Sequence, residues 1–317
     1  CIDDGSTDRS WEILAEYAKA DARILPIRQE NQGVSTARNN GIKKASGKYL
    51  IFMDPDDWYP EKDILEVLFE KAENSGCQIC GGEFSEYNDR TGEVRTEFPE
   101  QYFGYVFQKE GVIEYRDWQF DFGYHRFLYN REFILEHQLY FPKLIRFQDP
   151  PFFVKAMITA EKFYAVKKVV YRYRYGHRDL KWTREKRIAL LKGIYMDMDM
   201  AVRNHLERLV DLTWFRMTEE FGEIICCGII EGETEIEEWI RRVYDCLEID
   251  RKEKYGYPFY RRFRDEVILL KEKQRKEDER LENEIKAIKN SITFRVGKYL
   301  LYIPRCIKLA LWSRKKS

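Results

Sequence analysis

The chain has 317 residues, of which 44% are hydrophobic and 35% are charged, with 18 glycines and 9 prolines. This composition is that of a globular protein of one large domain or two domains, and it excludes the collagen-like and disordered classes. The 55 Lys and Arg residues balance the 55 Asp and Glu residues, so the net charge is zero. Nucleic acid is therefore not an expected partner, and no apolar run reaches the roughly 20 residues of a membrane span.

The first 80 residues alternate between helical and strand patterns. Helices are predicted at 10–20, 33–45 and 61–74, and strands at 24–28, 49–53 and 77–80. This alternation is typical of βαβ units, so we predict an α/β fold with a mostly parallel sheet. The opening residues Cys1-Ile2-Asp3-Asp4 read as a strand already under way, so we expect that an N-terminal piece precedes them.

The later part of the chain becomes helical. After a loose stretch of polar turns and aromatic residues, the patterns predict helices and one strand at 131–137, 149–160, 163–174 (the strand), 186–206, 209–230, 235–247 and 263–292. Leu281, Ile285, Ile288 and Ile292 follow heptad spacing in the last helix. That short seam favours either a homodimer or an intramolecular helix pair.

The cysteines and the C-terminal tail indicate where in the cell the protein is expected. Seven scattered cysteines favour a reducing cytoplasm, and Cys77 and Cys80 are interpreted as buried strand residues rather than zinc ligands. Residues 291–317 hold seven Lys or Arg and no acidic residue, interleaved with apolar residues. Such a segment suits an anionic membrane surface, the alternative being a helix that packs on its own domain. We expect a cytoplasmic protein that is peripheral on the cytoplasmic face of the membrane.

Two acidic clusters follow predicted strands, namely Asp3-Asp4 and Asp54-Pro55-Asp56-Asp57. The carboxyl ends of parallel strands form the edge at which ligands bind in open sheets. Like charges that converge there repel each other unless a cation lies between them. Hard oxygen ligands suit Mn²⁺ or Mg²⁺ that carries a diphosphate.

Three blocks in this chain resemble family 2 glycosyltransferases, in family order and at family-like spacing. They are Ile2-Asp3-Asp4-Gly5-Ser6-Thr7-Asp8, Asn31-Gln32-Gly33-Val34-Ser35-Thr36-Ala37-Arg38-Asn39-Asn40-Gly41 and Gly47-Lys48-Tyr49-Leu50-Ile51-Phe52-Met53-Asp54-Pro55-Asp56-Asp57-Trp58. The resemblance is clear over about residues 1–80 and looser to about residue 180. It implies a GT-A fold, which is Rossmann-like, and an inverting enzyme that uses a nucleotide-diphosphate sugar. The family's first strand has no counterpart in this chain.

The resemblance also implies roles for single residues. Asp3 or Asp4 matches the acid that binds the nucleotide base, and Arg38 lines the nucleotide pocket, its alternative being a salt bridge that holds the sheet edge. Asp54 and Asp56 match the DxD motif, in which the first acid faces the ribose and the second binds the metal. Asp57 is the weaker candidate and is alternatively a turn cap.

The catalytic base expected from the family is Asp149, in Gln148-Asp149-Pro150-Pro151. The family's usual Glu is Gln148 here, and the alternative for Asp149 is a helix N-cap. The segment Tyr171-Arg172-Tyr173-Arg174-Tyr175-Gly176-His177-Arg178 resembles the family's Tyr-x-Tyr-Arg segment. Candidate diphosphate contacts in it are Arg174, His177 and Arg178, with His177 alternatively a loop residue or a metal ligand.

These readings combine into one prediction. A GT-A domain without its first strand spans 1–182, a helical region 183–262, a long charged helix 263–290 and a basic amphipathic tail 291–317. The predicted function is a hexosyltransferase-like enzyme that moves a sugar, with a UDP-sugar as the preferred donor, to a saccharide or lipid-linked saccharide hydroxyl in bacterial capsule, exopolysaccharide or cell-wall glycan synthesis. The alternative is a non-catalytic, membrane-associated subunit or a carbohydrate-binding partner protein.

Overall fold

The structure, a computed structural model, describes residues 1–99, 103–177, 180–255 and 259–290. The chain divides into two compact units, residues 1–256 and 257–317. The predicted boundary at residue 182 lies within the first unit and stays a prediction. The predicted basic tail, residues 291–317, lies outside the described residues, as does Arg178.

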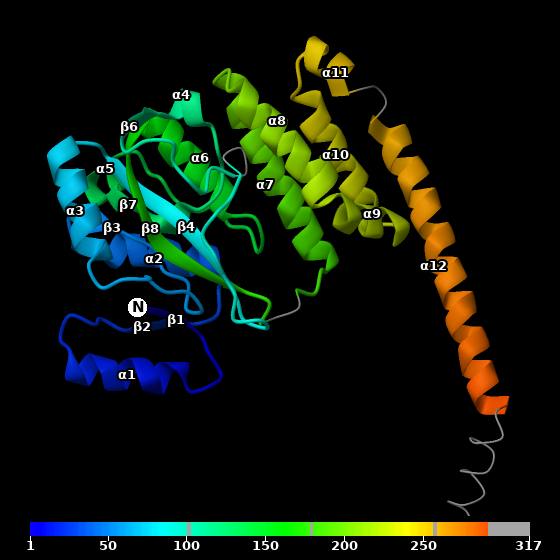
Figure 1. The fold of residues 1–317 in the computed structure, drawn as a ribbon, viewed down its shortest axis with the longest axis horizontal. Coiled ribbons are helices and arrows are strands. Elements are labelled where there is room, and N and C mark those ends of the chain that lie inside the picture. The colour runs from blue at the N-terminus through cyan, green and yellow to red at the C-terminus, as the bar shows by residue number, and fades with distance from the viewer. Residues whose placement is uncertain (100–102, 178–179, 256–258, 291–317) are drawn as a thin grey trace, which may run out of the picture. The chain divides into compact units, whose positions relative to one another are not determined.

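Unit 1 combines two sheets with eleven helices that the structure describes (Figure 1). The strands are β1 Ile2–Asp4, β2 Ile27–Gln29, β3 Tyr49–Leu50, β4 Ile79–Asn88, β5 Val94–Arg95, β6 Gly111–Glu114, β7 Phe127–Asn130 and β8 Lys162–Tyr175. The helices are α1 Ser10–Ala20, α2 Val34–Lys44, α3 Ile64–Ser75, α4 Tyr115–Trp118, α5 Arg131–Glu136, α6 Asp149–Ala160, α7 Arg184–Arg203, α8 Glu207–Phe215, α9 Gly222–Ile230, α10 Thr234–Asp245 and α11 Ile249–Tyr255. A 3₁₀ turn, η1, spans Tyr124–Arg126, and a π-helical turn, η2, spans Arg216–Glu220.

The larger sheet is mixed, so the prediction of a mostly parallel sheet was wrong. Its strand order is β3-β7-β4-β8-β6, with β5 added to β4. Only β4 and β8 pair in parallel there, and the other pairs are antiparallel. The strand β6 lies in the loose stretch, and β7 lies between that stretch and the predicted helix at 131–137, where no element is predicted. They run against their neighbours, and strand direction depends on pairing between distant segments rather than on local periodicity.

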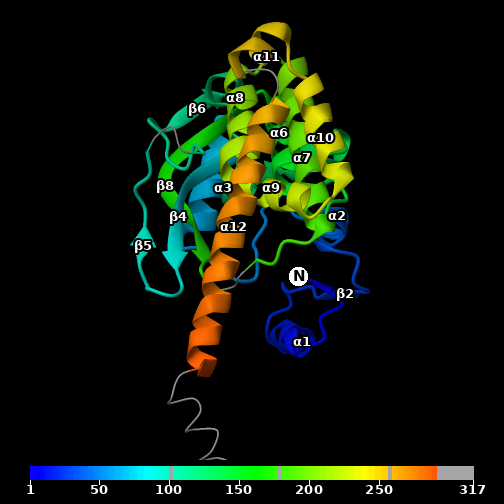
Figure 2. The same ribbon diagram turned by 90° about the vertical axis from the view of Figure 1, so that its right-hand side faces the viewer.

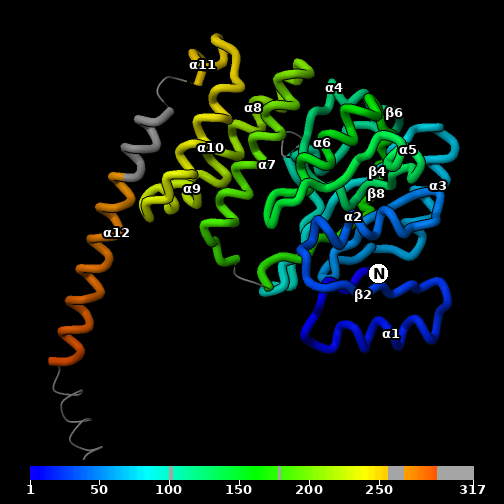
Figure 3. The backbone as a smooth tube through the Cα atoms, turned by 180° about the vertical axis from the view of Figure 1, so that it is seen from behind, coloured from blue at the N-terminus to red at the C-terminus, as the bar shows by residue number. Residues whose placement is uncertain are grey.

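Helices cover both faces of the larger sheet because side chains alternate along its strands. On β7, Leu128 belongs to the cluster that includes Ile64 and Leu68 of α3. The neighbouring Phe127 packs instead against Phe153 of α6, with ring centres 5.0 Å apart. The helices α3 and α6 therefore bury opposite faces, and Figure 3 shows the same arrangement from behind.

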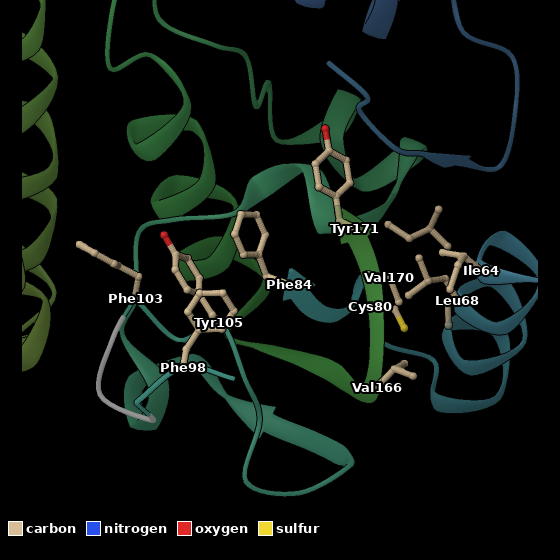
Figure 4. Packing of buried hydrophobic residues seen from close by; sticks show 12 residues of the cluster. Ile64, Leu68, Cys80, Phe84, Phe98, Phe103, Tyr105, Val166, Val170 and Tyr171 are labelled. Atoms are coloured by element: carbon tan, nitrogen blue, oxygen red, sulfur yellow. The ribbon is translucent and has the colours of Figure 1, made fainter. Parts of the chain in front are cut away.

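A group of aromatic rings extends the core beyond α3. Figure 4 shows the aliphatic side chains of α3 gathered beside Val170, while the rings of Phe84, Phe98 and Tyr105 form a separate group. The ring of Phe84 stacks on that of Tyr105 with centres 4.6 Å apart. The high aromatic content is thus largely core material.

The helices α7 to α11 form a helical region beside the larger sheet (Figure 2). The single helix predicted over 209–230 is instead α8 and α9, separated by η2. Unit 2 contains α12, Phe259–Asn290, in which Leu281, Ile285 and Ile288 are exposed. No helix among the described residues combines the length and the apolar character needed to cross a bilayer.

Arg126 is a fully buried cation that joins the segment at 104–105 to β4. Its Nη1 donates to the carbonyls of Gly82 and Tyr105, at 2.9 and 3.1 Å, and its Nη2 donates to the carbonyl of Gly104 at 2.6 Å. The ring of Phe127 lies 5.0 Å from the guanidinium carbon. Burial lowers the pKa of Arg126 to about 9.

We expect Arg126→Met to lower the free energy of unfolding by about 2 to 3 kcal/mol, because it leaves buried carbonyl groups without donors. Urea unfolding followed by fluorescence measures the loss. The control Arg116→Met replaces an exposed arginine of α4 and should change stability by less than about 0.5 kcal/mol. Equal stability of the two variants would contradict this role for Arg126.

Candidate active site

The acidic loop Asp54–Asp57 follows β3 and is tied to the end of β8. The Tyr171 hydroxyl accepts a hydrogen bond from the Asp54 N–H at 3.2 Å and donates one to Asp57 Oδ2 at 2.7 Å. The Arg174 N–H donates to Asp57 Oδ1 at 2.8 Å. Burial raises the pKa of Asp57 to about 6, and the charges of Asp54 and Asp56 raise it too. Asp57 therefore holds the loop on the sheet, and it does not cap α3, whose N-cap is Asp63.

Arg38 of α2 forms an ion pair with Asp54 across this loop, with Nη2 and Oδ1 2.6 Å apart. The guanidinium carbon lies 4.8 Å from the ring centre of Tyr124 and 5.3 Å from that of Phe141. The Tyr124 hydroxyl also donates to Asp54 Oδ1, at 3.2 Å. Nη1 of Arg38 is buried and has no hydrogen-bond partner among the described residues. The structure thus contains the salt bridge that was the alternative role for Arg38. The N–H groups on Nη1 remain as donors for a further group.

Asp149 opens α6 and lies in the electrostatic field of the same cluster. Burial raises the pKa of its carboxyl, the charge of Arg38 opposes that shift, and the charge of Asp54 adds to it. The next two residues, Pro150 and Pro151, have no N–H group, so the first turn of α6 offers few donors to stabilise the ionised carboxylate. A carboxylate in such surroundings is a better proton acceptor than an ordinary exposed aspartate.

Asp56 pairs with His177, with Oδ2 and Nε2 2.9 Å apart. The two side chains keep 28% and 18% of their surface exposed. The described residues contain no group of three or more His, Cys, Asp or Glu that could by itself hold a metal ion. The carboxylate of Asp56 nevertheless fits Mg²⁺ or Mn²⁺, since Mg²⁺ is commonly held by one or two carboxylates and completes its shell with phosphate oxygens and water.

The two acids of β1 differ in their partners. Asp4 accepts hydrogen bonds from the Gln29 side chain at 2.7 Å and from the N–H groups of Gln32 and Gly33, at 2.9 and 2.8 Å. Its oxygens are thus engaged at the start of α2. Asp3 is 3% exposed, and its Oδ2, 3.3 Å from Nε of Arg28, has no hydrogen-bond partner among the described residues. Asp3 Oδ1 accepts a hydrogen bond from the Ser6 N–H at 3.2 Å, so Oδ2 of Asp3 is the carboxylate oxygen of these two acids that is left without a hydrogen bond among the described residues.

The three candidate diphosphate contacts differ in their relation to the acidic loop. Nη2 of Arg174 lies 2.6 Å from Asp89, so its charge is already paired away from the acidic loop. His177 joins the loop through Asp56, and Arg178 is not described. Sequence reasoning missed Tyr124, which carried no motif, and it did not distinguish Tyr171 within the Tyr-x-Tyr-Arg segment that it had singled out.

Comparisons with known proteins identify what this chain is similar to. Residues 1–137 match the family model described as Glycosyl transferase family 2. Uncharacterized glycosyltransferase EpsJ of Bacillus subtilis (strain 168) is 38% identical over 180 residues, covering 55% of this chain and 51% of EpsJ. Putative glycosyltransferase EpsH of the same organism is 33% identical over 185 residues, with the same two coverages. The chain spans about half the length of these curated relatives.

A solved structure confirms the fold. The crystal structure of S. aureus TarS 1-349 in complex with UDP-GlcNAc superposes with a TM-score of 0.63 over 78% of this chain and 71% of that chain. The sequence identity is 15%, so the likeness is one of fold, and it bears out the predicted GT-A fold followed by a helical region. The family model and the two Bacillus relatives show that residues 1–137 of this chain are a glycosyl transferase family 2 segment.

Proposed function

We propose that this protein transfers a sugar from a UDP-sugar to a saccharide hydroxyl with inversion at the anomeric carbon. The observation that carries the proposal is the ion pair of Arg38 with Asp54, whose Nη2 and Oδ1 lie 2.6 Å apart and whose two charges also act on the pKa of Asp149. Asp56, two residues along the same loop, adds the pair with His177. Together these residues would give one site a cation, a proton acceptor and metal ligands.

The reaction is a single displacement. Asp149 accepts the proton of the acceptor hydroxyl as the acceptor oxygen bonds to the anomeric carbon. The bond from that carbon to the donor phosphate breaks, and the electron pair leaves with UDP. Holding both substrates in line and stabilising the developing diphosphate charge account for most of the catalysis expected of such a site.

Two groups of side chains would bind the donor. Asp3 would contact the base and Asp54 the ribose, with Arg38 beside them. Asp56 and His177 would hold Mn²⁺ or Mg²⁺, and such an ion, when bound, neutralises charge on the diphosphate. The solved relative of the same fold binds UDP-GlcNAc, which supports a UDP-sugar as the donor class. We place the acceptor among the saccharides and lipid-linked saccharides of bacterial capsule, exopolysaccharide or cell-wall glycan synthesis.

We expect Asp149→Asn to lower turnover by at least about 100-fold, because the amide cannot accept the proton. In the native enzyme kcat/KM should fall as the pH drops through the pKa of Asp149, since only the ionised carboxylate is active. Burial raises that pKa, so the fall should begin at a higher pH than for an exposed aspartate. UDP release measured against pH tests both points, with Asp117→Asn on α4 as the exposed control. Turnover of Asp149→Asn within about threefold of native would exclude Asp149 as the base.

The thermal midpoint of the full-length protein should rise by several degrees with UDP or a UDP-sugar plus Mn²⁺. A ligand at about 100 times its dissociation constant adds roughly 2.7 kcal/mol of stability. Asp56→Asn should lose the part of the shift that depends on Mn²⁺, whereas the exposed control Asp250→Asn should keep it. The absence of a shift with any nucleotide would favour the alternative of a non-catalytic subunit.

A membrane role for the tail has its own test. Deleting residues 291–317, which carry seven basic residues and no acid, should release the protein from vesicles that contain anionic lipid. Sedimentation with and without anionic lipid measures this release. Unchanged sedimentation of the deletion variant would show that the tail does not bind the membrane.

A further inference from the structure

The segment that leads into Asp149 is held at its beginning by α2. The side-chain amide of Asn39 donates to the Phe141 carbonyl and accepts from the Phe141 N–H, both at 2.9 Å. The hydroxyl of Ser35 donates to the carbonyl of Leu144 at 3.0 Å. The helix that contributes Arg38 therefore also fixes the start of this segment.

The end of the segment has a strained backbone at Phe147. Its φ is +59°, in the left-handed region that a bulky residue rarely occupies. Such a conformation costs on the order of 1 to 3 kcal/mol and persists only where the surroundings impose it. Phe147 lies two residues before Asp149 and is 5% exposed. The direction in which the chain enters α6 thus depends on what packs against Phe147.

The first of these contacts comes from Gly193 in the middle of α7. A Cβ atom at residue 193 would lie 2.5 Å from the Phe147 carbonyl oxygen and 2.7 Å from its ring carbon Cδ1. The closer of the two is a backbone atom, which cannot move aside as the end of a flexible side chain can. Only glycine lets α7 approach this strained residue so closely.

The second contact is the buried cation of Arg216, in the π-helical turn η2. Its guanidinium carbon lies 4.6 Å from the ring centre of Phe147. Nη1 donates to Asp121 Oδ2 at 2.7 Å and Nε donates to Glu220 at 2.9 Å. Arg216 is 4% exposed, so this arrangement is fixed from several sides. Single π-helical turns often occur at functional sites.

We propose that Gly193 and Arg216 are positioning residues for Asp149, so that the helical region is a working part of the transfer site. The inference rests on the proposed role of Asp149 as the base. Gly193 and Arg216 both lie against Phe147. They fix the backbone conformation of Phe147. That conformation determines the position of the Asp149 carboxylate in the first turn of α6.

If Gly193 and Arg216 had a purely structural role, a different result would be expected. If these residues only stabilise the fold, their variants should be less stable but should turn over normally once folded. If they position Asp149, kcat should fall while the KM for the donor changes by less than about twofold. A small misplacement of a catalytic group is enough to lower kcat by about 10- to 100-fold.

The test compares Gly193→Ala with Gly222→Ala in the full-length protein. A Cβ at residue 222, the first residue of α9, would meet nothing within 4 Å, so that variant controls for adding a methyl group to a helix of this region. UDP release is measured from UDP-GlcNAc, UDP-glucose and UDP-galactose, and hydrogen exchange is measured at residues 144–149. We expect lower kcat and faster exchange at 144–149 for Gly193→Ala alone. Should Gly193→Ala fail to fold, Arg216→Lys, which keeps the charge but loses the planar group, is expected to show the same pattern.

A double-variant cycle separates this inference from the role of Asp149 itself. If Gly193 acts through the carboxylate, adding Gly193→Ala to Asp149→Asn should lower kcat no further. Full additivity, or a folded Gly193→Ala with native exchange at 144–149 and native kcat, would overturn the inference. Native turnover of Asp149→Asn alone would instead remove the base, and so identify the proposed function as the part that failed.

Discussion

The ion pair between Arg38 and Asp54 is the interaction on which the site depends. It joins α2 to the acidic loop after β3 beneath the rings of Tyr124 and Phe141. The Arg38 side chain is only 13% exposed, so removing Asp54 would leave its charge largely buried and uncompensated, which is destabilising. The same helix holds Phe141 through Asn39. A single helix therefore sets the acidic loop and the start of the segment that leads to Asp149.

The environment of Asp149 illustrates how the fold tunes one carboxyl group. Burial favours its protonated form, and the two prolines that follow it remove amide donors which would have favoured the ion. Arg38 acts in the opposite direction and keeps the ionised form accessible. The balance suits a group that must be ionised before reaction and must then take a proton.

Local sequence patterns predicted the features that depend on neighbouring residues, and they missed those that depend on contacts between distant segments. The acidic residues at strand ends and the helix from Asp149 were found because turn residues and apolar periodicity mark them. The mixed sheet was missed because the direction of β7 follows from its pairing with β3 and β4, which no periodicity encodes. Tyr124 and Arg216 were missed because each acts through contacts with residues that are distant in sequence. In the sequence, Tyr124 cannot be told apart from any buried aromatic residue, nor Arg216 from any solvent-exposed charge.

The assignment of the donor site is tested most directly by a crystal structure of the full-length protein with UDP and Mn²⁺. We expect the ion between the diphosphate and Asp56, with Asp54 beside the ribose and the Asp149 carboxylate facing the site that the sugar would occupy. A contrary result would be UDP bound elsewhere, for example in the cavity of about 570 Å³ that Phe107, Trp118 and Arg208 help to line. The acidic loop would then be a structural feature of the sheet rather than the place where transfer occurs.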